Sequence, residues 1–269
     1  MAKPMPPHVS LPAAQHLVVR YAKRGKMRFA SHRDVARAFE RGVRRAGLPI
    51  AYSSGFSPHP KISYTGGAPT GVASEAEYLT ISLTSPKAAD QVREQLDAVL
   101  PAGLDVVDVT ETGAAGSPEA SLWQVMLPGV RPEAAAAAVA GFLAMTQAPV
   151  ERVTDKGVRR MDARAAVTEM AVVYPFDEPD QGDAGRATVT GEPDCAILRM
   201  VVLHMAPAVR PEDVLSALSA EQGLVPSSPP LTTRLAQLWP GSDRPQEGRP
   251  ELSQPEQGSR GLLTGKTLS

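Results

Sequence analysis

The pattern from Ser31 to Ala46 predicts an amphipathic helix, and this helix constrains the expected fold more than any other segment. Ser31 is a favourable N-cap, and Asp34 three residues later makes a close variant of the capping box. Small and apolar residues recur at helical spacing and predict the buried side: Val35, Ala38, Phe39, Gly42, Val43 and Ala46. Gly47 and Pro49 then end the helix.

Strand patterns surround this helix. They cover residues 16–21, 49–52, 61–64, 77–83 and 104–109, and a second helix pattern that opens on a proline covers 86–100. Loops rich in proline and glycine, at 53–60 and 65–71, separate the middle strands. We take the order as β-α-β-β-α-β, which is the split βαβ arrangement of ferredoxin-like folds.

A similar but less regular order follows. Strand patterns cover 122–127, 150–154, 158–162, 165–174 and 196–205, and helix patterns cover 131–145 and 211–221. We therefore predict an α+β fold of two ferredoxin-like modules packed together, the second less regular than the first. The predicted parts are a flexible leader (1–15), a basic module (16–115), a second α+β module (116–239) and a disordered tail (240–269).

The charge of the chain is strongly polarised. The net charge is −1, but residues 16–64 hold eleven basic residues against two acidic residues, Asp34 and Glu40, for a formal charge of +9. From Thr65 onward, 16 basic residues face 27 acidic ones, for a charge of −11. Such a local field points to an anionic partner for the first module.

Several classes of protein are disfavoured by composition. The single cysteine, Cys195, allows no disulfide within the chain and no cysteine-ligated cluster, and we expect it to be a buried strand thiol. No stretch approaches the ~20 apolar residues of a membrane span, and no signal peptide is recognisable, so we predict a cytoplasmic protein.

The exposed side of the first helix predicts the binding surface. Arg33, Arg37, Arg41 and Arg45 recur every four residues and form one ridge, with Arg44 beside it. Their planar donor forks suit phosphates, so we predict an RNA-binding surface formed by Lys26, Arg28, Arg33, Arg37, Arg41, Arg44, Arg45, Phe56, His59 and Lys61. The alternative is a solvated face that the acidic second half neutralises.

Aromatic residues are concentrated in the same segment. We expect Tyr21, Phe29 and Phe39 to lie in the core, whereas Phe56 lies between Gly55 and Ser57-Pro58 in a stiffened loop. Phe56 is therefore our candidate for base stacking, with packing as the equal alternative.

The signals for catalysis and cofactors are weak. His32 and His59 are the candidates for general acid–base cleavage of RNA, but no second partner stands at a defined spacing. The glycine loop 65–71 lacks a Walker lysine, and a plain connection between strands is the favoured interpretation. A basic group in the second half (Arg152, Lys156, Arg159, Arg160 and Arg164) is expected at strand edges. We expect no metal and no cofactor.

Three motifs together resemble a known family. They are residues 26–34 (Lys-Met-Arg-Phe-Ala-Ser-His-Arg-Asp), 52–63 (Tyr-Ser-Ser-Gly-Phe-Ser-Pro-His-Pro-Lys-Ile-Ser) and 75–79 (Glu-Ala-Glu-Tyr-Leu). This is similar to the radical-SAM-linked bacterial domain of unknown function, over roughly residues 16 to 235. Other members are often fused behind a radical SAM domain. No Cys-x3-Cys-x2-Cys occurs here, so the resemblance implies a stand-alone form without radical chemistry of its own.

Three hypotheses for function follow. The first is a non-enzymatic RNA-binding accessory protein that serves a separate RNA-modifying or RNA-processing enzyme. The second is an adaptor that docks an acidic protein surface, and the third is a metal-independent endoribonuclease.

Overall fold

The computed structural model of the protein describes residues 10–111, 117–155, 157–173 and 195–240. Most of the predicted leader and nearly all of the predicted tail, residues 1–9 and 241–269, lie outside the described residues. In the part that is described, no helix is both long enough and apolar enough to cross a lipid bilayer.

The first half contains four strands and two α-helices in the order β-α-β-β-α-β. The predicted strand at 49–52 is wrong, because Ile50 and Tyr52 form only isolated bridges, to Leu83 and Pro60. Its elements are β1 (Gln15–Lys23), the short 3-10 helix η1 (Gly25–Phe29), α1 (His32–Arg45), β2 (Ile62–Thr65), β3 (Ala73–Leu83), α2 (Ala89–Asp97) and β4 (Leu104–Thr110). The strands lie in the order β4-β1-β3-β2, and every neighbouring pair is antiparallel. Both α-helices pack on one face of these strands, since Phe39, Leu96 and Leu79 share a single buried cluster.

The second half repeats this layout with additions. Its elements are β5 (Ala120–Pro128), α3 (Pro132–Ala144), β6 (Pro149–Thr154), β7 (Gly157–Asp162), α4 (Ala163–Ala166), β8 (Val167–Val173), β9 (Cys195–Leu203), α5 (Pro211–Gln222) and β10 (Leu231–Leu238). The main strands lie in the order β10-β5-β9-β8. Strands β6 and β7 form a separate two-stranded sheet. A second buried cluster, which includes Val125, Phe142 and Leu218, fills this half.

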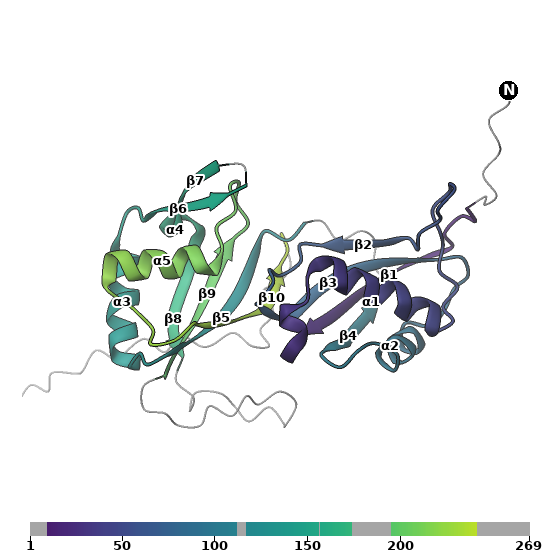
Figure 1. Cartoon of the computed structure of the whole chain (residues 1–269), viewed down its shortest axis with the longest axis horizontal. Coiled ribbons are helices and arrows are strands. Elements are labelled where there is room, and N and C mark those ends of the chain that lie inside the picture. Colours follow the sequence, from purple (N-terminus) through teal and green to yellow (C-terminus); the bar gives the residue numbers. More distant parts are fainter. Residues whose placement is uncertain (1–9, 112–116, 156, 174–194, 241–269) are drawn as a thin grey trace, which may run out of the picture.

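The two halves share one sheet, although we had expected two modules that merely pack together. Strand β10 pairs with β5 on one side and, in parallel, with the beginning of β3 on the other. The junction is short: Thr233 lies opposite Ala73, and Arg234 lies opposite Ser74. The result is an eight-stranded, mostly antiparallel sheet that runs through the whole molecule, with the halves side by side (Figure 1).

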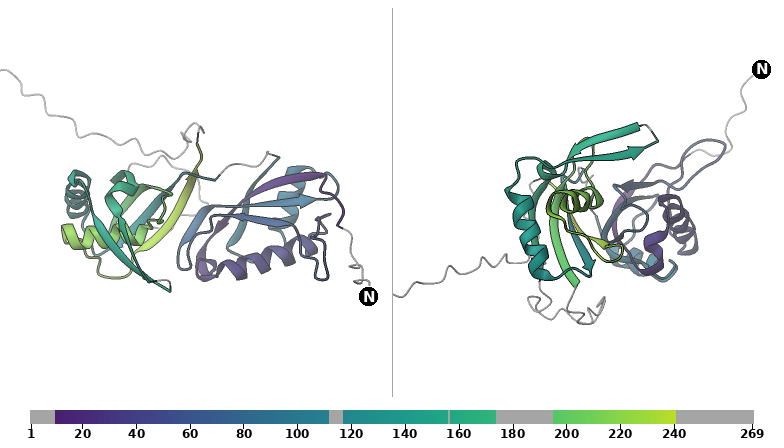
Figure 2. Two further views of the ribbon diagram at one scale, coloured as in Figure 1. Left: turned by 90° about the horizontal axis from the view of Figure 1, so that it is seen from above. Right: turned by 60° about the vertical axis from the view of Figure 1, so that its left-hand side comes forward.

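The arrangement of helices leaves α1 at the surface of the first half. In Figure 2, the purple helix α1 lies along one face of the strands and turns its far side away from the rest of the molecule. The predicted arginine ridge occupies that far side, so the fold presents the ridge to solvent.

Candidate nucleic-acid interface

Helix α1 forms as its sequence predicts. The Ser31 hydroxyl accepts a hydrogen bond from the backbone N–H of Asp34, and the Asp34 carboxylate accepts one from the backbone N–H of Ser31 at 3.2 Å. These bonds to Ser31 hold the pKa of Asp34 below its usual value. On the buried side, the Phe39 ring is fully covered and meets the Tyr21 ring edge-on at 4.7 Å. The helix is therefore fixed in orientation.

The opposite side of α1 carries the arginine ridge, which we define as Arg33, Arg37, Arg41 and Arg45 with Arg44 beside them. All five side chains are exposed. Among the described residues, none of them takes part in an ion pair within 4.0 Å. Five guanidinium groups thus keep their donors turned to solvent along a helix of 14 residues.

The two acidic residues of α1 form no ion pair within 4.0 Å with the ridge among the described residues. The Asp34 carboxylate is occupied by the helix cap. Glu40 is half-buried, and its charge adds to the burial that raises the pKa of the Tyr64 hydroxyl. Among the described residues, Glu40 forms no ion pair within 4.0 Å with a ridge arginine.

The loop after α1 is an ordered hairpin. Lys61 N–H donates to the Ala51 carbonyl at 2.8 Å, and Ser53 N–H donates to the His59 carbonyl at 2.9 Å. The hairpin projects at the end of the first half that lies far from β10 (Figure 1). Phe56, near its tip, is 67% exposed, so its ring is available for contact. The packing alternative for Phe56 has no support in this arrangement.

Lys61 lies on a different face from the ridge. It comes directly before β2, where Ile62 and Tyr64 pack towards the cluster under α1. Because side chains alternate along a strand, Lys61 belongs to the opposite face, next to Ser82, whose N–H donates to the Lys61 carbonyl. The predicted surface therefore bends around the sheet edge between Arg45 and Lys61.

Phe29 is exposed, so the prediction that it lies in the core is wrong. It is the last residue of η1, a short 3-10 helix that has no buried residue, and 67% of it is exposed. The neighbouring Arg28 is less available than predicted. Its Nε donates to the Gly71 carbonyl at 2.7 Å, and its Nη2 donates to the Thr232 carbonyl at 3.4 Å. Lys26, in the same turn, is exposed.

The two candidate catalytic histidines lie apart. His32 begins α1, and its ring meets the Tyr64 ring at 5.1 Å. Four residues, 60–63, lie between His59 in the hairpin and Tyr64, and extended chain of this length spans roughly 16 Å. The structure does not bring these histidines to one site.

A buried polar cluster, which the sequence did not reveal, fixes the glycine loop between the two halves. We call it the clasp, and it consists of Lys23, Glu77 and Arg234. All three residues are at most 5% exposed. Arg234 Nη1 lies 3.1 Å from Glu77 Oε1 and donates to the Gly66 carbonyl at 2.7 Å. Glu77 Oε2 accepts from the Ala68 N–H at 2.9 Å, so carboxylate and guanidinium hold the same loop.

Lys23 completes the clasp from β1. Its Nζ donates to the carbonyls of Ala68 and Pro69, each at 3.2 Å. Burial lowers the pKa of Lys23, and burial also lowers the pKa of Arg234, whose guanidinium stacks 4.8 Å from the Trp123 ring. The glycine loop is therefore held by buried charges, which supports the prediction of a structural connection rather than a phosphate site.

Sequence comparison places the protein in a family. A model of uncharacterized proteins conserved in bacteria, DUF2344, matches residues 16–211. The chain belongs to DUF2344. No curated protein matches the chain. A solved structure of an unknown protein from Galdieria sulphuraria covers 82% of this chain and 98% of that chain, at 13% identity. Its TM-score of 0.23 is too low to inform the fold.

The DUF2344 match spans α1, the hairpin and the glycine loop, but it ends before β10. Lys23 and Glu77 thus lie inside the family region, whereas Arg234 lies beyond it. A sequence signal exists for Glu77, which shares its strand parity with the buried residue Leu79. No such signal exists for Lys23, because an irregularity between Tyr21 and Lys23 interrupts the alternation of β1.

The basic residues in the second half of this DUF2344 protein mostly have protein partners. Arg152 lies 2.7 Å from Asp213, and Arg160 lies 2.7 Å from Glu151. Arg164 donates to the carbonyls of Leu143 and Val167. Arg159 is exposed, and Lys156 lies outside the described residues. Within the described ranges, no three His, Cys, Asp or Glu side chains gather in a way that would hold a metal ion.

Proposed function

We propose that this DUF2344 protein is an RNA-binding accessory protein whose main contact surface is the arginine ridge. One observation carries the proposal: five exposed arginines follow one another along α1 without an ion pair among the described residues. Ordinary charged helix faces mix signs and form acid–base pairs at i,i+4 spacing. A row of unpaired guanidinium groups is instead suited to successive phosphates, which each fork binds bidentately.

The exposed aromatic rings favour RNA over a purely electrostatic partner. Phe29 and Phe56 are both 67% exposed and belong to segments that directly precede and follow α1. Aromatic rings beside a basic groove are the usual platform for unpaired bases. An acidic protein surface would use the arginines but would give these rings no comparable role.

We take each half as a ferredoxin-like module, because both show the order βαββαβ in their main strands and the corresponding strand order in the sheet.

The proposed accessory role rests on the resemblance to the radical-SAM-linked family and on the single cysteine of the chain. The radical-SAM link that the motifs suggest would place any radical chemistry in a separate enzyme, since one cysteine cannot ligate such a cluster. In this proposal, the protein binds RNA and delivers it to a separate enzyme that modifies or processes it.

Charge reversal on the ridge tests the proposal. Arg37→Glu with Arg41→Glu should abolish binding of single-stranded RNA at physiological salt, measured by fluorescence anisotropy. The matched control is Arg159→Glu with Arg160→Glu, which makes the same change in net charge on the exposed strand β7. If both double variants bind RNA as wild type does, the ridge is not the surface. If both lose binding equally, the effect is one of overall charge.

The same purified protein can be used to test the two alternative functions, the protein-docking adaptor and the endoribonuclease. An acidic protein or polyglutamate is added in excess to the complex of the protein with RNA. If it displaces no RNA, the result would argue against the adaptor hypothesis. Cleavage of end-labelled RNA in EDTA that depends on His32 or His59 would support the endoribonuclease hypothesis, which the separation of these two histidines disfavours.

A further inference from the structure

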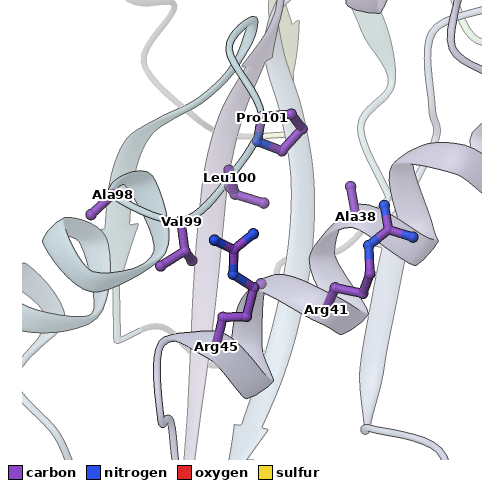
Figure 3. Close-up of a pocket in the computed structure, with 8 residues that line it drawn as sticks. Ala38, Arg41, Arg45, Ala98, Val99, Leu100 and Pro101 are labelled. Atoms are coloured by element: carbon purple, nitrogen blue, oxygen red, sulfur yellow. The ribbon is translucent and has the colours of Figure 1, made fainter.

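A small hollow opens beside the arginine ridge. It lies between α1 and the segment that follows α2, and its volume is about 270 Å³. Arg41 and Arg45 stand at its α1 side, and Val99, Leu100 and Pro101 form the opposite wall (Figure 3). The side chain of Arg45 reaches towards Val99 and Leu100 in this view. The hollow therefore combines two cations with an apolar wall.

Small residues on α1 make the hollow possible. Ala38 and Gly42 lie on the turns next to the two arginines and line the hollow. A Cβ atom at Gly42 would lie only 3.1 Å from Leu100 Cδ2 and 3.9 Å from Val99 Cγ2. The segment after α2 thus packs closely on the helix at Gly42, and the hollow forms where the longer arginine side chains stand clear of it.

The acidic residues of α2 do not fill the site. Glu94 lies 3.6 Å from Arg93, and Asp97 Oδ1 accepts the Val106 N–H at 2.8 Å. Within the described residues, neither Arg41 nor Arg45 has an ion-pair partner. The two guanidinium groups therefore remain free to bind an anion from solution.

We propose that this hollow binds one unpaired nucleotide of an RNA chain. Its base lies against Val99, Leu100 and Pro101, and its phosphate lies between Arg41 and Arg45. Guanidinium planes also stack on unpaired bases. A base within a duplex stays stacked and cannot enter, so the hollow selects RNA with a bulged or looped nucleotide. This inference rests on the proposed RNA-binding function and names its substrate class.

Filling or altering the hollow without touching the arginines tests this assignment. Ala98 lines the hollow and is exposed, so Ala98→Leu should fill it without disturbing the core. Ala102→Leu, exposed on the same segment but not lining the hollow, is the matched control. Val99→Ser removes part of the apolar wall and gives a second, independent variant. The probes are a labelled RNA hairpin whose two strands are joined by a non-nucleotide linker and which has one bulged adenosine, the same hairpin without the bulge, and free adenosine monophosphate.

Wild type and Ala102→Leu should prefer the bulged hairpin by about tenfold, the scale of one stacked base. Ala98→Leu and Val99→Ser should each remove this preference and leave the affinity for the paired hairpin unchanged. Equal binding of both hairpins by wild type, or an undiminished preference in both hollow variants, would overturn the nucleotide assignment while leaving RNA binding by the ridge intact. Binding of free adenosine monophosphate as tightly as the bulged hairpin would show that the site takes free nucleotides instead. Failure to bind either hairpin would overturn the proposed function itself.

Discussion

Phe56 tests whether an exposed side chain contributes binding energy without contributing to the fold. Its ring is 67% exposed at the hairpin tip, so Phe56→Ala should change the free energy of unfolding by no more than about 0.5 kcal/mol. The same change should weaken binding of single-stranded RNA by about 1–3 kcal/mol and leave the salt dependence unaltered. Val153→Ala, 81% exposed in the second half, serves as the control. A loss of stability without a loss of affinity would show that the ring packs rather than stacks.

Lys61 tests how far the RNA path extends. It lies at the edge of the sheet beside Ser82, on the face opposite to the side chains that pack under α1. Lys61→Ala should lower the slope of log affinity against log salt by about one unit, because one phosphate contact is lost. Titrations at several salt concentrations measure this slope. An unchanged slope would confine the path to the α1 side.

His204 gives the stability of the protein a dependence on pH. Its Nδ1 lies 2.8 Å from the Pro118 carbonyl, and its Nε2 lies 2.9 Å from the Ser121 hydroxyl. With its proton on Nδ1, the neutral ring donates to Pro118 and accepts from Ser121. Partial burial of the ring lowers the pKa of His204, although the residue as a whole is exposed, so the folded protein binds the second proton less readily than the unfolded chain does.

Protonation of His204 should lower the free energy of unfolding as the pH falls. The contribution of His204 to the free energy of unfolding is complete above the unfolded pKa of about 6.5, and it is lost as the pH falls through the lower, folded pKa. Urea unfolding between about pH 8 and pH 5 should therefore show declining stability in wild type. His204→Gln should flatten the decline, and an equally steep decline in that variant would assign the effect to other groups.

At the scale of elements, α1 was the most predictable part of the molecule. Ser31, Asp34 and the spacing of Val35, Phe39 and Val43 give its cap and its buried side from local rules alone. Strand β10 was not predicted, because its buried residues are the polar Thr232, Arg234 and Gln237. A strand whose inward face is polar has no apolar alternation, and its partners lie far away in sequence.

The clasp and the exposure of Phe29 were also not predicted, because both depend on tertiary structure. Lys23 and Glu77 occupy inward strand positions, but a buried charge is recognised only when its partner, here Arg234, is known. Phe29 was assigned to the core because it is aromatic, yet the short turn of η1 buries none of its residues. The distribution of basic residues in the sequence predicted the basic surface. Tertiary contacts determine which of these basic side chains remain exposed.

Loss of one clasp residue should destabilise the protein strongly. Arg234→Met leaves the carboxylate of Glu77 buried without its guanidinium partner, and such changes cost about 3–5 kcal/mol. Urea unfolding monitored by circular dichroism measures the loss. Arg160→Met, which breaks the exposed pair with Glu151, should cause little change. Equal, small effects of both variants would show that the clasp is not a main determinant of stability.

At the scale of the whole molecule, one continuous sheet joins a basic half to an acidic half. The +9 charge of residues 16–64, the −11 charge of residues 65–269 and the single positive charge of Lys3 leave a net charge of only −1. In the second half, Arg152 and Arg160 pair with carboxylates, whereas the ridge arginines of the first half have no ion-pair partner among the described residues. The unpaired positive field is thus concentrated on α1, which supports the proposal that α1 forms an RNA-binding surface.

The salt dependence of RNA binding tests this account most directly. Five phosphate contacts on a single strand predict a slope of log affinity against log salt of about −3.5, measured from about 50 to 200 mM salt. Arg37→Ala with Arg41→Ala removes two of these contacts without reversing their charge, so it should reduce both the affinity and the slope, to about −2. A wild-type slope close to zero, or the same steep slope in wild type and the double variant, would contradict the assignment of RNA binding to the arginine ridge.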